Sequence, residues 1–152
     1  MQLGHAAIAL SISTYDWNPK TILLVFFFHY LPNFDVIPIK LGMAKPEFHF
    51  TVTHSLFFAT IVSLFASLFS YEIGLLAIIC LLTHYAADFG CARGQPLLYP
   101  FSDKTFGLPL FEDTGFWGKE AIMGYYKQPW SWILESVAFL FLAYRFTVLY
   151  YT

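Results

Sequence analysis

The sequence predicts an all-α integral membrane protein, a bundle of about four hydrophobic helices. Of its 152 residues, 58% are hydrophobic and 21% aromatic, while charged residues make up 12%. That charged share is about half the roughly 25% of an ordinary soluble domain. So few charges cannot cover a small water-soluble protein, which excludes a soluble enzyme and a disordered chain. The 8 basic and 10 acidic residues argue against nucleic acid as the main partner, and 2 cysteines are too few for a disulfide framework.

The first 31 residues predict a short helical hairpin. Residues 3–15 are apolar, but as a helix they rise only about 20 Å. Asn18 and Pro19 mark a turn, and residues 21–31 are apolar again until Pro32 ends the run. Both pieces are short for full membrane spans, so we expect a tilted or partly inserted hairpin. No basic segment precedes the first apolar run, so a cleaved signal peptide is not expected.

Residues 51–90 predict an antiparallel transmembrane hairpin. Residues 51–71 carry no charge and, as a helix, would rise about 31 Å, enough for the hydrocarbon core. Glu72 interrupts the apolar sequence, and residues 73–87 are again uncharged. Because only a tight turn at residues 71–72 separates the two runs, their helices should pack antiparallel.

Residues 129–151 predict a third transmembrane segment. Pro129 suits the first turn of a helix. Aromatic residues stand at both ends, as in the belts of membrane helices: Trp130, Trp132, Tyr144, Tyr150 and Tyr151. Glu135 and Arg145 are each within reach of an interface, so we expect both side chains to snorkel toward water.

Two loops, residues 32–50 and 91–128, complete the single membrane domain predicted over residues 1–152. The hairpin of residues 51–90 places both loops on the same side of the membrane. That side holds six of the eight basic residues: Lys40, Lys45, Arg93, Lys104, Lys119 and Lys127. By the positive-inside rule, the loop-rich side is expected to be cytoplasmic. The second loop is long for a structureless connection, so we expect it to cover a functional site.

Histidine and aspartate residues converge at one depth of the predicted hairpin. His84 and Asp88 lie four apart, so one helix face presents both, as a metal-binding pair or as a hydrogen-bonded pair between helices. Measured from the turn, His54 lies about 26 Å up, Asp88 about 25 Å and His84 about 19 Å. Residues remote in sequence therefore approach the same membrane face. We expect this trio to hold a divalent metal ion.

Other residues extend or flank this predicted site. His5 precedes the first helix and Asp35 follows the second, so both can join the cluster. His49 is either a ligand or an outer-shell partner of a ligand, whereas His29, flanked by aromatic residues, is more typical of a packing residue. Four residues complete the expectations: Ser55 as a helix cap or a packing residue, Cys91 as a loop thiol, and Arg93 with Lys104 as cations that meet an anionic substrate or simply follow the positive-inside rule.

Five pieces of the sequence in order resemble a known family. They are GH at 4–5, LPNFD at 31–35, HFTVTHSL at 49–56, HYAAD at 84–88 and GQPLLYPFS at 94–102. This order resembles the YdjM family of bacterial inner-membrane proteins, whose members are expected to be membrane-bound metal-dependent hydrolases. The match covers most of residues 1–105.

The resemblance implies a set of metal-site residues. The family's histidines and aspartates fall on His5, Asp35, His49, His54, His84 and Asp88. Two positions depart from its pattern: Asn33 stands where an aspartate is usual, and Phe50 where an arginine is usual. A more distant likeness to zinc-dependent phospholipases C implies similar chemistry. The additional histidine ligands of those enzymes have no counterpart after His84, so one or two metal ions are expected rather than three.

These observations lead to a hypothesis of metal-dependent hydrolysis at the cytoplasmic interface of the inner membrane. One or two divalent ions, with zinc the first choice, would be held by His5, Asp35, His54, His84 and Asp88. Asp35 is also the first candidate for a general base. The expected substrate is a membrane lipid or another amphiphilic phosphoester. The alternative is a non-catalytic membrane protein that binds metal or haem, for which His29 and His84 could face each other, or that assembles with partners.

Overall fold

The structure is a computed structural model that describes residues 1–115 and 118–151. Its helices are α1 (Leu3–Ser13), α2 (Pro19–Tyr30), α3 (Val36–Lys40), α4 (Leu56–Ser67), α5 (Tyr71–Asp88), α6 (Lys119–Tyr126) and α7 (Pro129–Tyr151). Three 3₁₀ turns join them: η1 (Leu31–Asp35), η2 (Pro46–Phe48) and η3 (Val52–His54). The described residues form no strand, only isolated bridges of Cys91 with Phe111 and of Gln95 with Phe106. The all-α prediction is confirmed.

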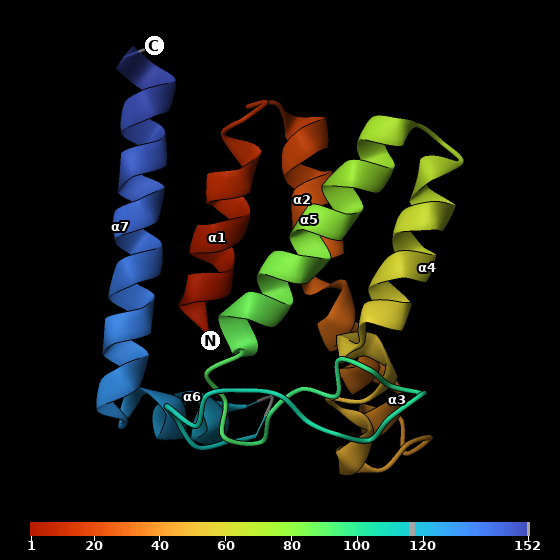
Figure 1. The fold of residues 1–152 in the computed structure, drawn as a ribbon. Coiled ribbons are helices and arrows are strands. Elements are labelled where there is room, and N and C mark those ends of the chain that lie inside the picture. Colours follow the sequence, from red (N-terminus) through yellow and green to blue (C-terminus); the bar gives the residue numbers. More distant parts are fainter. Residues whose placement is uncertain (116–117, 152) are drawn as a thin grey trace.

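Two antiparallel helix pairs and one long helix make up the bundle (Figure 1). The pair α4–α5 packs closely, α5 also contacts α2 and α1, and α7 packs along α1. The connections α1–α2 and α4–α5 lie at one end, which we call the turn end. The opposite end, which we call the site end, carries α3, α6 and the loop after α5 (Figure 1). The two loop segments therefore lie on the same side of the bundle, as predicted.

Side-chain caps define where three of the apolar helices begin. Asn18 accepts a hydrogen bond from the Thr21 backbone N–H at 3.0 Å, and Pro19 follows in the first turn of α2. Ser55 caps α4 through the Phe58 N–H, and Ser70 caps α5. The expected cap at Ser55 is confirmed. It also places the start of α4 at residue 56, because the capping residue itself is not helical.

The prediction of a membrane-spanning helix over residues 51–71 is therefore wrong. With 12 residues, α4 rises only about 18 Å, too little to cross a hydrocarbon core of about 30 Å. The helical course from Pro19 instead continues through η1 and α3 to Lys40. Pro32 does not end this helical course. Proline has no backbone N–H, but near the start of η1 that N–H would have no partner within the turn, so its absence is tolerated. The short helix α6 also lies within the predicted loop of residues 91–128.

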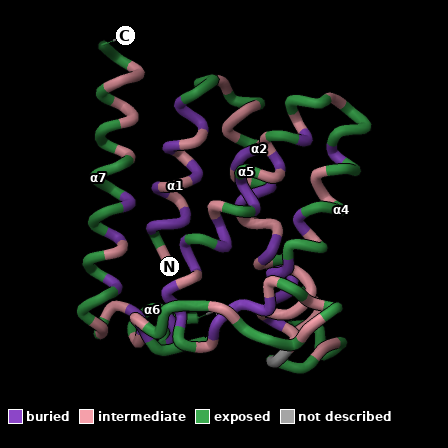
Figure 2. Tube along the Cα trace, viewed as in Figure 1, coloured by how far each residue is buried: buried purple, intermediate pink, exposed green. Residues whose placement is uncertain are grey.

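Within the described residues, three segments are long and apolar enough to cross a membrane: Pro19–Lys40, Tyr71–Asp88 and Pro129–Tyr151. The third has the bounds that the sequence predicted. Burial is concentrated on α1, α2 and α5, whereas α7 is largely exposed along its length (Figure 2). Large apolar side chains such as Leu23, Leu64 and Leu140 point outward from the helices. Such a surface is typical of a protein that faces lipid rather than water.

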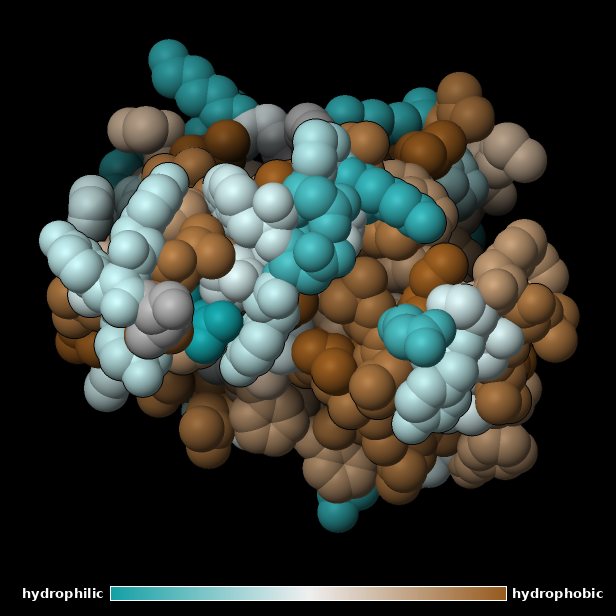
Figure 3. Space-filling model, turned by 90° about the horizontal axis from the view of Figure 1, so that it is seen from above, coloured by the Kyte–Doolittle hydropathy of each residue, from teal (hydrophilic) through white to brown (hydrophobic). Residues whose placement is uncertain are grey.

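The two charged residues of α7 differ from each other. Glu135 is buried, and its Oε1 accepts a hydrogen bond from the Gln2 backbone N–H at 2.9 Å, so the expected snorkelling of this side chain is wrong. Arg145 reaches the turn end, where it donates to the Thr14 hydroxyl and lies over the Tyr15 ring. In a view onto the turn end, apolar side chains reach the surface between a few hydrophilic residues (Figure 3).

Small residues allow the helices to approach closely around the core. One core cluster combines Ala9, Val25, Phe28, Ala66, Ala77 and Cys80 from four helices. At Gly74, an added Cβ would lie 1.9 Å from the Ser67 hydroxyl oxygen, so only glycine permits this contact between α5 and α4. A separate small core of Cys91, Phe111 and Tyr125 packs the site-end loop against α6. This packing holds the loop over the end of α5.

Candidate metal centre

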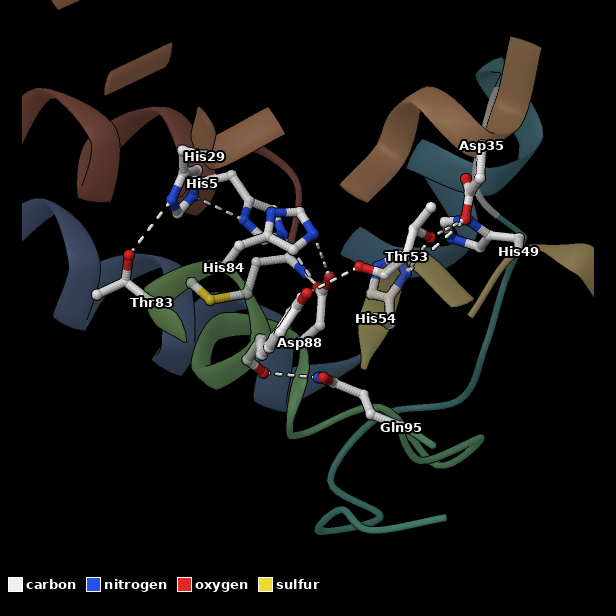
Figure 4. A network of polar contacts seen from close by, with 12 residues as sticks. His5, His29, Asp35, His49, Thr53, His54, Thr83, His84, Asp88 and Gln95 are labelled. Atoms are coloured by element: carbon white, nitrogen blue, oxygen red, sulfur yellow. Dashed lines mark hydrogen bonds and ion pairs between the residues drawn. The ribbon is translucent and has the colours of Figure 1, made fainter. Parts of the chain in front are cut away.

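The site end gathers all five histidines and two aspartates in one buried cluster (Figure 4). None of these seven residues is more than 7% exposed. Their candidate ligand atoms form three groups, in each of which the atoms lie within 4.8 Å of one another: His54–His84–Asp88, His5–His29–His84 and Asp35–His49–His54. Because two histidines are shared between groups, the cluster is continuous. The predicted trio is thus brought together, and its role as a ligand set stays a prediction.

His54 is held in one orientation by α5 and by its own neighbour. The Tyr85 hydroxyl lies 2.8 Å from the Thr53 carbonyl oxygen and 3.1 Å from that of Ser55, which fixes η3. The Thr53 hydroxyl donates to Asp35 Oδ2 at 2.7 Å, so its oxygen accepts from His54 Nδ1 at 3.1 Å. His54 therefore carries its proton on Nδ1. Its Nε2 has no hydrogen-bond partner and turns a lone pair toward the cluster.

His84 and Asp88 lie on one face near the end of α5. His84 is fully buried, and neither of its ring nitrogens has a hydrogen-bond partner. Its Nε2 lies 3.3 Å from Asp88 Oδ2, within ion-pair distance but outside hydrogen-bond geometry. Asp88 Oδ1 lies 2.7 Å from the Met1 α-amino nitrogen and 3.0 Å from His5 Nε2. The His84 ring centroid is 5.4 Å from that of His54.

His29, for which the sequence favoured a packing role, also lies in the cluster. Its Nδ1 donates to the Cys80 carbonyl oxygen at 3.1 Å, which leaves Nε2 to accept from His5 Nδ1, also at 3.1 Å. His5 then turns the lone pair of its Nε2 toward Asp88 Oδ1, 3.0 Å away. Two acceptors face each other at that distance only when a proton or a cation lies between them. A shared proton or a bound cation is therefore required between His5 and Asp88, whose Oδ1 also accepts from the Met1 α-amino group.

The second carboxylate has partners on both of its oxygens. Asp35 Oδ1 lies 2.8 Å from His49 Nδ1, and Oδ2 accepts from Thr53 and lies 3.8 Å from His54 Nδ1. A carboxylate behind histidine ligands fixes the orientation of their rings and raises their basicity. The structure thus pairs His49 with Asp35 and also includes His49 in a candidate ligand group, so both roles that the sequence left open for it, ligand and outer-shell partner, stay predictions.

These donors fit a borderline divalent ion such as Zn²⁺. Imidazole nitrogen and carboxylate oxygen are its ordinary ligands in proteins. Burial lowers the pKa of His54 well below its usual value, so this imidazole is neutral, the form that binds metal ions. The unpartnered nitrogens of His54 and His84 are the atoms that such an ion would satisfy. Residues from five elements supply the cluster, so the ion would also join the helices to the turns η1 and η3.

A cavity of about 80 Å³ leads from the surface to the cluster. The buried residues His5, His49 and Asp88 line it together with the less buried Phe50 and Asp113. This volume is enough for a few water molecules. The cluster is therefore reachable from solvent at the site end, although His54 and His84 themselves are fully buried.

The two predicted cations differ in their relation to this cavity. The Arg93 guanidinium lies 5.7 Å from the Phe50 ring centroid and 3.5 Å from Asp113, and both of those residues line the cavity. Lys104 is exposed and lies over the Phe106 ring instead, which does not line the cavity. Cys91 borders the cavity, and burial raises the pKa of its thiol, so it is protonated at neutral pH, as expected for a loop thiol.

Comparison with protein families identifies the chain. The family model described as YdjM inner membrane protein matches residues 2–152. The chain belongs to the YdjM family. Comparisons with curated proteins and with solved structures gave no significant match. Membership of the YdjM family makes this an inner membrane protein, in agreement with its three candidate spans.

The motifs that suggested the YdjM family meet in space. Four of the five contribute residues to the His/Asp cluster. The fifth motif, GQPLLYPFS, lies in the loop after α5 and bonds to α5 and to the start of α4. Gln95 donates to the Tyr85 carbonyl oxygen at 2.6 Å, and the Leu97 carbonyl oxygen accepts from the Leu56 N–H at 2.9 Å. This segment therefore holds α4 and α5 together beside the cluster.

The sequence did not predict the roles of three residues: His29 in the cluster, and Thr53 and Tyr85, which position His54. For His29 the sequence does contain a signal. Counted from Asp16 in the α1–α2 turn, His5 and His29 lie about 16 and 20 Å along their helices. Depth along the α1–α2 hairpin therefore pairs His5 with His29, as depth pairs the residues of the 51–90 hairpin. No comparable signal marks Thr53 or Tyr85, because their roles depend on how η3 packs against α5.

Proposed function

We propose that this chain is a membrane-bound, metal-dependent hydrolase whose substrate is a lipid or another phosphoester at the membrane interface. The observation that carries the proposal is the set of buried imidazole nitrogens without hydrogen-bond partners beside Asp88: His54 Nε2 and both nitrogens of His84. Each unsatisfied buried polar group destabilises a fold by about 1–3 kcal/mol. A bound cation would remove that penalty and would explain why these nitrogens are buried without hydrogen-bond partners.

The ligand atoms are assigned from the hydrogen-bond pattern. His54, His84 and Asp88 would hold one ion, with His5 and Asp35 as ligands of the same ion or of a second one. A divalent ion supplies a Lewis acid that activates water and polarises an ester or phosphoryl oxygen. The Thr53–Asp35 chain keeps the His54 proton on Nδ1, and His29 does the same for His5. Both chains leave the inner nitrogen deprotonated and aimed at the cluster.

Asp35 remains our candidate for the general base. Its oxygens already accept from His49 and Thr53, so a proton taken up at Asp35 would arrive through one of these two groups. His49 lines the cavity, which makes it the contact between this carboxylate and a substrate. In this scheme His49 takes up the proton at its other ring nitrogen while its Nδ1 proton moves to Asp35, so Asp35 becomes the base and the imidazole stays neutral.

Two features favour a phosphoester at the membrane interface over a soluble neutral substrate. The cavity opens at the end of α5, one of the three candidate spans, where lipid head groups would lie. Arg93 places a guanidinium at the edge of that cavity, and arginine binds phosphate with several hydrogen bonds at once.

We place the site end on the cytoplasmic side of the inner membrane, because it carries six of the eight basic residues. Single cysteines at Glu72→Cys and Lys104→Cys test the orientation by labelling with a membrane-impermeant reagent. Residue 72 should react from the periplasm and residue 104 only after the membrane is opened. The native thiols of Cys80 and Cys91 are buried, which limits background labelling. Reaction of both positions from the same side would contradict the assignment.

The hydrolase proposal is tested on protein purified in detergent. Metal analysis should give about one or two divalent ions per chain in the wild type and a large loss in His84→Ala. Hydrolysis of phospholipids or soluble phosphoesters should stop on chelation and return when zinc is added. Turnover that survives chelation, or equal turnover by His84→Ala and wild type, would overturn the mechanism.

The alternative function, metal or haem binding without catalysis, has less support. Haem ligation by His29 and His84 needs a ring nitrogen of each residue for the iron. Both nitrogens of His29 already have partners, His5 and the Cys80 carbonyl oxygen. Stoichiometric metal without turnover on any substrate would favour a non-catalytic metal protein, and a haem spectrum would favour the haem protein.

A further inference from the structure

A second cavity adjoins the site cavity and differs from it in chemistry. Its volume is about 380 Å³, within the roughly 300–1,000 Å³ of small-molecule sites. Gln2, His5 and Asn33 line both cavities, so the two meet at the His/Asp cluster. Beyond that shared wall the second cavity is lined mainly by apolar side chains, namely Tyr30, Phe34, Val36, Ile37 and Ile122. We call this second cavity the lateral groove.

The apolar wall of the lateral groove is formed mainly by residues of a candidate membrane span. Four of its apolar lining residues belong to the candidate span Pro19–Lys40, and the fifth, Ile122, lies on α6. Phe34, Ile37 and Ile122 are 45%, 52% and 44% exposed, so the groove wall is continuous with the outer surface. A ligand entering here from a membrane would need no passage through water.

We propose that the lateral groove binds one acyl chain of a membrane lipid, with the lipid's polar end directed to the His/Asp cluster. This inference rests on the proposed hydrolase function and names its substrate class as a membrane lipid rather than a water-soluble phosphoester. The wall that the two cavities share at His5 carries it, because a polar chamber next to an apolar one matches an amphiphile.

Another apolar hollow in the bundle shares no wall with the site cavity. It lies between α2, α4 and α5, has a volume of about 590 Å³, and is lined only by apolar residues such as Phe28, Ile61 and Phe69. None of its lining residues belongs to the site cavity or to the His/Asp cluster. A lipid chain there would place no polar group at the cluster, whereas one in the lateral groove would.

The proposal is tested by photolabelling in vesicles of phosphatidylglycerol and phosphatidylethanolamine that contain a phosphatidylglycerol with a diazirine on its acyl chain. Mass spectrometry of the cross-linked peptides locates the label. We expect Phe34–Ile37 to be labelled more strongly than the exposed apolar residues of α7. Ile122→Trp should fill the groove and reduce that label about tenfold, equivalent to about 1.4 kcal/mol.

Met123→Trp is the matched control. Met123 neighbours Ile122 on α6 and is 52% exposed, but it does not line the groove, so its label pattern should equal that of the wild type. Equal labelling of Ile122→Trp and wild type, or a label no stronger than on α7, would overturn the proposal. Labelling needs no turnover, so a labelled groove with no hydrolysis rejects only the proposed function. Hydrolysis of a short-chain phosphoester without groove labelling rejects only this inference.

Discussion

The two ends of the helical bundle hold their polar side chains in opposite ways. At the turn end, Asn18 caps α2, and the Thr21 hydroxyl donates to Asp16 at 2.6 Å. Hydrogen bonds from Thr21 and Asn18 lower the pKa of Asp16, which is exposed and stays ionised. At the site end, seven histidine and aspartate residues are buried, and nitrogens of His54 and His84 lack partners.

This difference separates polar groups that stabilise the fold from polar groups that are available to bind a ligand. Capping groups are satisfied by the helix that they begin, so their burial is unnecessary. Buried groups without partners oppose folding and are retained where another requirement outweighs stability. Changes at the site end should therefore affect metal binding and activity first, and changes at the turn end should affect stability alone.

The largest effect is expected for Asp88→Asn. The amide keeps the shape of the side chain but loses the charge that faces His5 and His84. We expect metal affinity and turnover to fall by more than about 100-fold, above the roughly 10–100-fold loss typical of an outer-shell partner. Competition with a chromophoric chelator measures the affinity. Wild-type affinity in Asp88→Asn would remove the carboxylate from the ligand set.

A smaller loss is expected for Asp35→Asn. An amide can still accept from Thr53, but it cannot take up a proton from His49. Turnover should fall about 10–100-fold while the fold is preserved. Steady-state kinetics beside metal content distinguish the roles: if Asp35 is a base, metal content stays near the wild-type value, whereas a ligand would lose metal too. Unchanged kinetics with unchanged metal would exclude both roles.

His29→Phe tests the half of the cluster that sequence reasoning missed. The phenyl ring fills similar space but cannot accept the proton of His5 Nδ1, so His5 is no longer held in one tautomer. We expect metal affinity to fall about tenfold. His29→Gln should recover most of it, because an amide can accept from His5 and donate to the Cys80 carbonyl oxygen. No difference between the two variants would assign His29 to packing.

The site was more predictable from sequence than the lengths of the helices that carry it. Depth along a hairpin depends only on residue count, so the meeting of His54, His84 and Asp88 followed even though residues 51–55 are not helical. The predicted span of residues 51–71 failed because apolar composition does not reveal where a helix starts. Ser55 carries that information, because a capping residue marks the position where the helix starts.

Other features depend on contacts that no local pattern encodes. Glu135 has the same sequence context as a snorkelling residue, and only the packing of α7 against α1 buries it beside Gln2. The helix α6 is short and weakly apolar, and its position depends on the small core that it shares with Cys91 and Phe111. The lateral groove likewise forms only where α6 meets the chain after α2.

The smallest effect is expected at the turn end, for Asn18→Ala. The substitution removes the oxygen that accepts from the Thr21 N–H at the start of α2. Loss of such a cap destabilises by about 1 kcal/mol, so the free energy of unfolding in mixed micelles should fall by about that amount. Metal affinity should stay at the wild-type value, because Asn18 lies at the opposite end of α2 from His29. Asn18→Ser, which restores a capping oxygen, should recover most of the stability. A loss of metal in Asn18→Ala would mean that the two ends are coupled through α2, and the separation between capping and ligand-binding groups would not hold.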